Sequence, residues 1–133
     1  MGSSKPRVGK KERDLILRAM VSMAIADGKF CEGETETVKS AYQDVAGAAC
    51  SEKDVETAVK NCQKEGQSLS DELCACHKAL DRDTKETLLK ACYKVLLADG
   101  RVAGRERKRL HDYAAALKVP EIHLTAILEE VSA

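Results

Sequence analysis

The sequence predicts an all-α fold, a compact bundle of about seven helices in one domain. Every patterned segment repeats its apolar residues at i, i+3, i+4 and i+7, as in Val38, Ala41, Tyr42 and Val45. No segment rich in Val, Ile and Thr alternates in the way that a half-buried strand does. Residues that typically end or start helices separate the apolar segments. A chain of 133 residues is long enough to form a hydrophobic core without disulfides or structural metal ions.

The punctuation divides the chain into its elements. Glycines that suit helix C-terminal caps are Gly28, Gly47, Gly66 and Gly100. Residues that suit N-caps are Ser51, Ser70 and Asp83. Pro120 suits the first turn of a helix. The expected helices span residues 12–27, 32–46, 51–65, 70–81, 84–99, 103–118 and 120–131. Residues 1–10 are expected to be a disordered start to a single domain that spans 11–133.

The composition excludes several classes of partner. Lys plus Arg equals Asp plus Glu at 22 each, so no global field attracts nucleic acid or a membrane surface. Aromatic residues that stack on bases are scarce. No apolar run approaches the length of a membrane span, and the start of the chain has no signal-peptide pattern. We therefore expect a cytoplasmic protein with no nucleic-acid and no membrane partner.

The chain has six cysteines, which are expected to stay reduced in the cytoplasm. The segment "CACH", Cys74 to His77, suggests zinc, but its cysteines are too close together for a zinc knuckle and no second knuckle accompanies them. Cys76 and His77 instead lie on an apolar helical stripe with Leu73 and Leu80. Cys62, Cys76 and Cys92 are accordingly predicted to be buried and unligated.

An internal repeat organises the predicted helices. A shift of 72 residues aligns Asp27 with Asp99 and Gly28 with Gly100. The same shift aligns the following pairs: Ile16 with Leu88, Ala19 with Ala91, Phe30 with Val102, Glu34 with Glu106, Val38 with Leu110, Ala41 with Tyr113, Tyr42 with Ala114, and Val45 with Leu117. Two units, about 12–65 and 84–131, are expected to bury their apolar faces against each other, with the helix at 70–81 linking them.

The segments "AIADGKFCEGE" and "VLLADGRVAGRE" resemble the helix–ADG–helix signature of the TerB-like domains, a family named for tellurite resistance and also found at the N-terminus of DjlA-type co-chaperones. The resemblance covers roughly residues 11–131, and the family's seven helices agree with the number expected here. It implies that acidic residues proposed to bind a metal or a partner correspond to Asp27, Glu34, Asp99 and Glu106. The second copy departs from the pattern, because a basic "RERKRL" follows it.

The residues of the ADG turn support two interpretations. In the first, Asp27 and Asp99 accept hydrogen bonds from loop amides, while Glu34 and Glu106, at the third position of the next helix, fold back toward its free amides. In the second, the same four carboxylates bind a divalent cation such as Ca²⁺ or Mg²⁺ weakly. Turn chemistry is the commoner use of Asp-Gly, and we favour it.

A basic cluster begins the second copy's downstream helix. It consists of Arg101, Arg105, Arg107, Lys108 and Arg109. A solvated face is the preferred interpretation. The alternative is a surface for an acidic partner or a phosphate, or for the acidic turn of another copy, which would form a homo-oligomer.

The sequence gives little support for catalysis. The three histidines have no Ser or Cys partner at a recognisable spacing, and no Gly-rich phosphate loop, HExxH or GxSxG motif is present. The expected function is therefore a non-enzymatic protein-interaction or scaffold module without a cofactor, in a stress-related setting that rests on the TerB-like resemblance. The alternative is a weak metal-binding or metal-sensing domain.

Overall fold

The computed structural model describes residues 10–24, 32–46, 50–64, 69–99 and 104–132, with the backbone alone for some residues at helix ends. These ranges contain seven α-helices, one 3-10 helix and no strand, which confirms the predicted all-α class. The elements are α1 (Lys10–Ala24), α2 (Glu32–Ala46), α3 (Glu52–Lys64), α4 (Leu69–Cys76), η1 (His77–Ala79), α5 (Arg82–Asp99), α6 (Gly104–Ala116) and α7 (Glu121–Ser132). None of the described helices is both long enough and apolar enough to cross a membrane.

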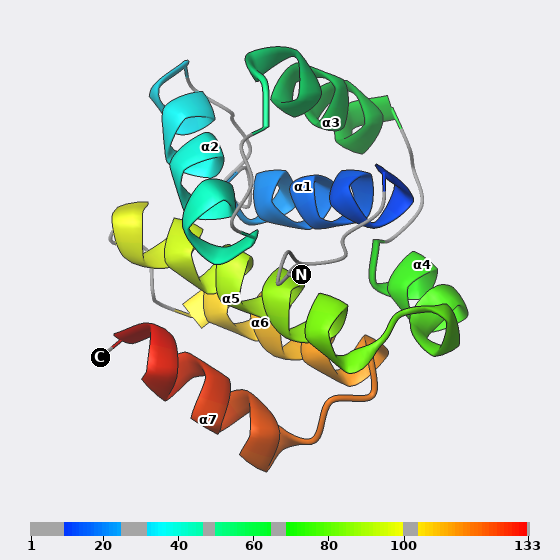
Figure 1. The fold of residues 1–133 in the computed structure, drawn as a ribbon. Coiled ribbons are helices and arrows are strands. Elements are labelled where there is room, and N and C mark those ends of the chain that lie inside the picture. The colour runs from blue at the N-terminus through cyan, green and yellow to red at the C-terminus, as the bar shows by residue number, and fades with distance from the viewer. Residues whose placement is uncertain (1–9, 25–31, 47–49, 65–68, 100–103, 133) are drawn as a thin grey trace, which may run out of the picture.

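The helices α1 and α5 form the centre of the bundle, and the other helices pack around them (Figure 1). They contact each other, and every residue of α1 from Leu15 to Met23 is buried except Arg18, whereas α5 keeps a polar face that includes Lys90 and Lys94. Fully buried residues of the two helices include Ile16, Ala19 and Met20 in α1 and Leu88, Ala91 and Cys92 in α5.

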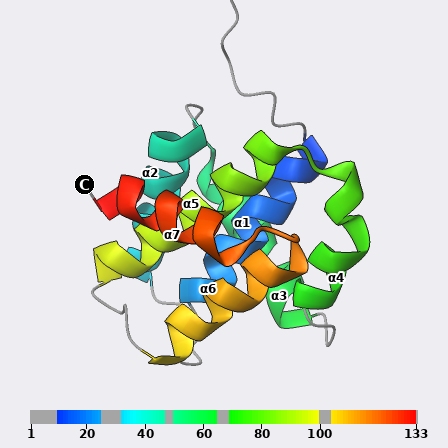
Figure 2. The same cartoon turned by 90° about the horizontal axis from the view of Figure 1, so that it is seen from below.

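The outer helices follow the order of the sequence repeat, but their packing is not fully symmetric. α3 packs against α1 (Figure 1), and α7 packs against α5, over which it lies when the bundle is viewed from below (Figure 2). In contrast, α2 packs extensively against α5, whereas its counterpart α6 makes few contacts with α1 and packs against α4 as well. The described positions paired by the 72-residue shift are buried in both copies, except that Val45 is half-buried. Superposition of the two halves stays a prediction.

The predicted helix over 70–81 is wrong at its C-terminal end. α4 ends at Cys76, η1 follows, and Leu80 has an extended backbone with a ψ of 131°. Leu80 is buried, and Asp81 next to it caps α5 by accepting a hydrogen bond from the Thr84 amide at 2.8 Å. The chain leaves the helix because it must both bury Leu80 and start α5 at Arg82.

The predicted N-caps have mixed outcomes. Ser51 is confirmed, since its Oγ accepts from the Asp54 amide and Asp54 Oδ2 accepts from the Ser51 amide, both at 3.1 Å. Ser70 and Asp83 are wrong as caps, because Ser70 lies inside α4 and Asp81 caps α5. The four predicted glycine caps lie outside the described residues.

Lys118 ends α6 in the left-handed conformation, with a φ of 62°. The Val119 amide donates to the Ala114 carbonyl at 2.9 Å, and the Lys118 amide donates to the Ala115 carbonyl at 3.0 Å. These two bonds define a Schellman motif, whose left-handed position usually holds glycine. The Leu124 amide then donates to the Pro120 carbonyl at 2.9 Å, which starts α7 immediately after the motif.

Lys118→Gly is expected to raise the free energy of unfolding by up to about 1 kcal/mol, because glycine has no Cβ to strain the left-handed backbone. Urea denaturation measures the change, with Lys118→Ala as the matched control that keeps a Cβ. Equal stabilities for the glycine and alanine variants would contradict the prediction.

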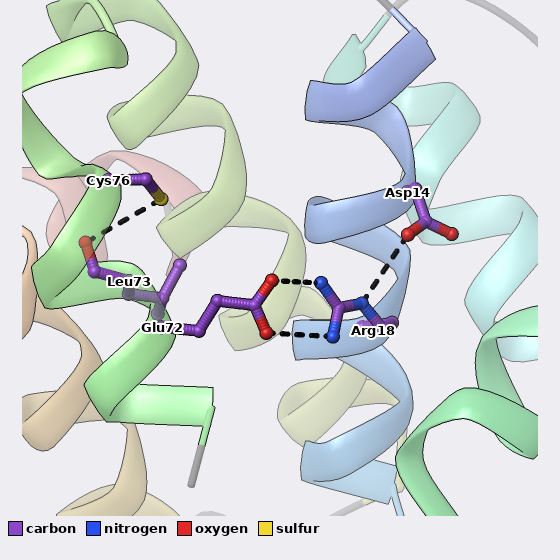
Figure 3. A network of polar contacts seen from close by, with 5 residues as sticks. All are labelled: Asp14, Arg18, Glu72, Leu73 and Cys76. Carbon is purple, nitrogen blue, oxygen red and sulfur yellow. Dashed lines mark hydrogen bonds and ion pairs between the residues drawn. The ribbon is translucent and has the colours of Figure 1, made fainter. Parts of the chain in front are cut away.

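An arginine joins α4 to the central helix α1 (Figure 3). Arg18 Nη1 and Nη2 donate to the two carboxylate oxygens of Glu72 at 2.9 Å and 2.5 Å. Arg18 Nε lies 3.4 Å from Asp14 Oδ2, one turn earlier on α1. The Arg18 side chain is 12% exposed, so the bidentate pair is largely shielded from solvent. Glu72 precedes the fully buried Leu73, and the pair therefore helps to hold α4 in register on the core.

Candidate functional site

The acidic residues of the ADG turns are only partly placed. Asp27 lies outside the described residues, and the side chains of Glu34, Asp99 and Glu106 are likewise not described. The backbone positions are informative: Asp99 is the last residue of α5, while Glu34 and Glu106 are each the third residue of α2 and α6. The two glutamates thus stand where a side chain can fold back onto a helix N-terminus, as the first interpretation requires.

The described residues contain no group of three His, Cys, Asp or Glu side chains that is arranged to hold a metal ion. This applies to the "CACH" segment, where Cys74 is exposed and Cys76 is half-buried. Cys76 Sγ lies 3.8 Å from the Leu73 carbonyl, within its own helix (Figure 3). For the four acidic residues of the ADG turns, metal binding stays a prediction.

Asp27→Ala and Asp99→Ala are each expected to lower the free energy of unfolding by on the order of 1 kcal/mol, as for a lost helix cap. Asp27→Asn is expected to have a smaller effect, because its amide oxygen still accepts a hydrogen bond. Thermal melts with a chelator and with added Ca²⁺ or Mg²⁺ measure these changes. A chelator-dependent loss confined to Asp27 would instead make the first ADG turn a metal site, because a bound ion stabilises the native state.

The structure describes three side chains of the predicted basic cluster, those of Arg107, Lys108 and Arg109, and they have different environments. Arg109 is half-buried, and its Nη1 donates to the Ser22 carbonyl at 2.9 Å. Ser22 lies near the C-terminal end of α1 as described, where the helix dipole favours a cation. Arg107 and Lys108 are exposed, and Lys108 lies 3.6 Å from Asp112 one turn later. Arg101 and the Arg105 side chain lie outside the described part.

A buried polar contact next to Arg109 was not predicted from the sequence. The Ser22 and Tyr113 hydroxyls are 2.5 Å apart, and Ser22 Oγ also donates to the Ala19 carbonyl at 2.7 Å. Both residues are nearly fully buried, so the contact satisfies two hydroxyls inside the core. Tyr113 on its apolar stripe gave a signal for burial, but nothing in the sequence indicated its partner on α1. This group links α1 to α6 and has a structural role.

The cysteine predictions are confirmed in part. Cys92 is buried, and burial raises the pKa of its thiol far above the ordinary value. Cys76 is half-buried rather than buried, because the helix changes to η1 directly after it. The Cys62 side chain lies outside the described part. Cys50, which was not predicted to be buried, lies in the core just before the capping box of α3.

A groove of about 530 Å³ lies between α2, α5 and the C-terminal end of α7. Ala41, Leu97, Ala98 and Val131 provide its apolar surface, while Thr37, Ser40 and three charged residues provide its polar surface. Leu97 is 40% exposed, one of the two large apolar side chains that stay exposed among the described residues. Sequence reasoning missed this groove, because it depends on how three helices meet.

Negatively charged side chains outnumber positively charged ones in the groove. Asp44 lies 3.3 Å from Lys94, which joins α2 to α5 along the groove. Glu36 is paired with Lys39 at 3.6 Å, but its side chain is 76% exposed and stays accessible. Two carboxylates and one ammonium group therefore line the groove. It offers an apolar surface beside an excess of negative charge.

Comparisons of this chain with family models, with curated proteins and with solved structures found no match. The TerB-like resemblance therefore stays an expectation based on the two ADG segments.

Proposed function

We propose that this chain is a non-enzymatic protein-interaction module, and that the groove between α2, α5 and α7 is where the partner binds. The observation that carries the proposal is the exposed Leu97 within a groove of about 530 Å³. A concave surface that combines apolar side chains with a few polar and charged groups is typical of a binding site. A TerB-like, stress-related setting remains part of the proposal through the resemblance alone.

The chemistry of the groove favours one kind of occupant. Leu97, Ala98 and Val131 fit apolar side chains of a partner segment, and the small Ala41 and Ala98 allow its backbone to approach closely. Glu36 favours a basic residue at the edge of that segment, because its carboxylate is exposed. The proposed occupant is therefore a segment of another protein that combines apolar residues with a Lys or Arg. A second copy of this chain is an alternative outcome of the test.

The test is affinity capture with the immobilised chain, comparing wild type, Leu97→Arg and Ile122→Arg. Ile122 is the matched control, because it is 82% exposed and does not line the groove. Leu97→Arg is expected to lose a partner that wild type and Ile122→Arg both retain, and the purified partner is expected to show the same order of affinities. Binding that is unaffected by Leu97→Arg, or equally lost in both variants, would refute the proposal.

A further inference from the structure

A second, smaller pocket lies at the other end of the α5–α7 pair. Its volume is about 230 Å³, and it lies between the first turns of α5 and the connection from α6 to α7. Along α5, Lys85 in this pocket and Leu97 in the groove are roughly 18 Å apart at 1.5 Å per residue. The pocket is smaller than the roughly 300–1,000 Å³ that drug-sized ligands occupy. It suits a small ligand.

The residues that line this pocket carry an excess of positive charge. Arg82 and Lys85 come from α5, and Lys118 comes from the left-handed position that ends α6. None of these three cations forms an ion pair with another described residue. The carboxylate of Glu86 lies on the same wall, 3.5 Å from His123 Nε2.

The other carboxylates close to these cations in the sequence have different environments. Asp81 Oδ1 accepts the Thr84 amide as the cap of α5. Glu121 lies 3.5 Å from His111. Asp83 is exposed and does not line the pocket. Three cations therefore face one carboxylate within the pocket, and that carboxylate already has a histidine partner.

The positive charge of these lysines also affects the pKa of His77, a residue of η1 close to the pocket. Loss of hydration, and then the charges of Lys85, Lys118 and Lys78, lower the pKa of His77 below its ordinary value. Lys85 and Lys118 are residues of the pocket, whereas Lys78 is on η1. The positive potential thus extends beyond the pocket to η1, where protonation of His77 is disfavoured.

We propose that this pocket binds a small phosphate-like oxyanion through Arg82, Lys85 and Lys118. Guanidinium and ammonium groups are the side chains that recognise phosphate, and Arg82 offers a planar fork for two oxygens. The ligand class is inorganic phosphate or a small phosphomonoester, whose charge of about −2 matches three cations beside one carboxylate. Phosphate binding would also explain why residue 118 is a lysine, although its left-handed backbone favours glycine.

The test is a thermal melt and calorimetric titration with two probes, inorganic phosphate and glycerol 3-phosphate, against sodium chloride at equal ionic strength. The variants are Arg82→Gln, Lys118→Gln and Lys118→Gly. The control is Lys60→Gln, an equal loss of charge at an exposed position on α3, which packs against α1 and α2.

Wild type and Lys60→Gln are expected to show a saturable rise in Tm with phosphate and none with chloride. Arg82→Gln and Lys118→Gln are each expected to bind about tenfold more weakly, as for the loss of one charge-assisted hydrogen bond. Lys118→Gly is expected to be more stable than wild type without phosphate and yet to bind phosphate equally weakly, which separates binding from folding. Non-saturable effects, or an equal weakening by Lys60→Gln, would overturn the proposal. A stronger response to glycerol 3-phosphate than to phosphate would identify a phosphomonoester as the ligand.

Discussion

Leu88→Ala is expected to lower the free energy of unfolding by about 2 to 5 kcal/mol. Leu88 is fully buried in α5, the helix that contacts α1, α2, α6 and α7, so the substitution is expected to leave a cavity that the surrounding structure fills only in part. The loss combines the transfer free energy of the removed methyl groups with a cavity term. Urea denaturation of the purified chain measures it.

The sequence repeat supplies a second substitution at the matching position. Ile16 is fully buried in α1, and the 72-residue shift aligns it with Leu88, so Ile16→Ala is expected to destabilise to a similar extent. Leu97→Ala is the control, with an expected loss below about 1 kcal/mol because Leu97 is 40% exposed. A loss for Leu88→Ala no larger than that for Leu97→Ala would show that α5 is not the central helix.

Arg18→Ala is expected to lower the free energy of unfolding by about 2 kcal/mol, through the loss of two charge-assisted hydrogen bonds to Glu72. Glu72→Gln is expected to have a smaller effect, because the Glu72 side chain is 37% exposed and solvent screens its charge. A double-mutant cycle between the two residues is expected to give a coupling of about 1 kcal/mol.

A more exposed ion pair between helices provides the control for this cycle. Lys90 Nζ lies 3.1 Å from Glu130 Oε2 between α5 and α7, and the Glu130 side chain is 68% exposed. The same cycle at Lys90 and Glu130 is expected to give less than about 0.5 kcal/mol. Equal coupling at the two pairs would contradict the structural role assigned to Arg18.

Much of the helical architecture could be predicted from the sequence, because the spacing of apolar residues and the identity of capping residues involve only residues that are close together in the sequence. Helix α2 begins and ends at the predicted residues, and the Ser51–Asp54 box begins α3 as expected for a serine cap. The end of α4 could not be predicted in this way. Leu80 leaves the helix because it is buried in the core, and Asp81 leaves it because its side chain caps α5. Both causes depend on tertiary packing.

The candidate sites were less accessible to sequence reasoning. Arg109 belonged to a charge run that favoured a solvated face, yet it donates to the Ser22 carbonyl on a helix 87 residues away in sequence. The expected helix over 103–118 ended at Lys118, but nothing in the sequence indicated a left-handed backbone there, because the residue expected at such a position is glycine. The groove and the smaller pocket combine residues from helices that meet only in the folded chain. Amino-acid composition and the helical period of apolar residues do not show which helices contact each other in the folded chain.

Site-specific photocrosslinking tests the central claim, that a partner segment occupies the groove between α2, α5 and α7. A photoreactive amino acid is placed at position 97 in one variant and at position 122 in another, and the crosslinked peptides are identified by mass spectrometry. The account predicts a crosslink from position 97 to one defined segment that contains apolar and basic residues, with loss of that crosslink when Glu36→Lys is added. Crosslinks of equal yield from both positions, or from position 122 alone, would contradict it.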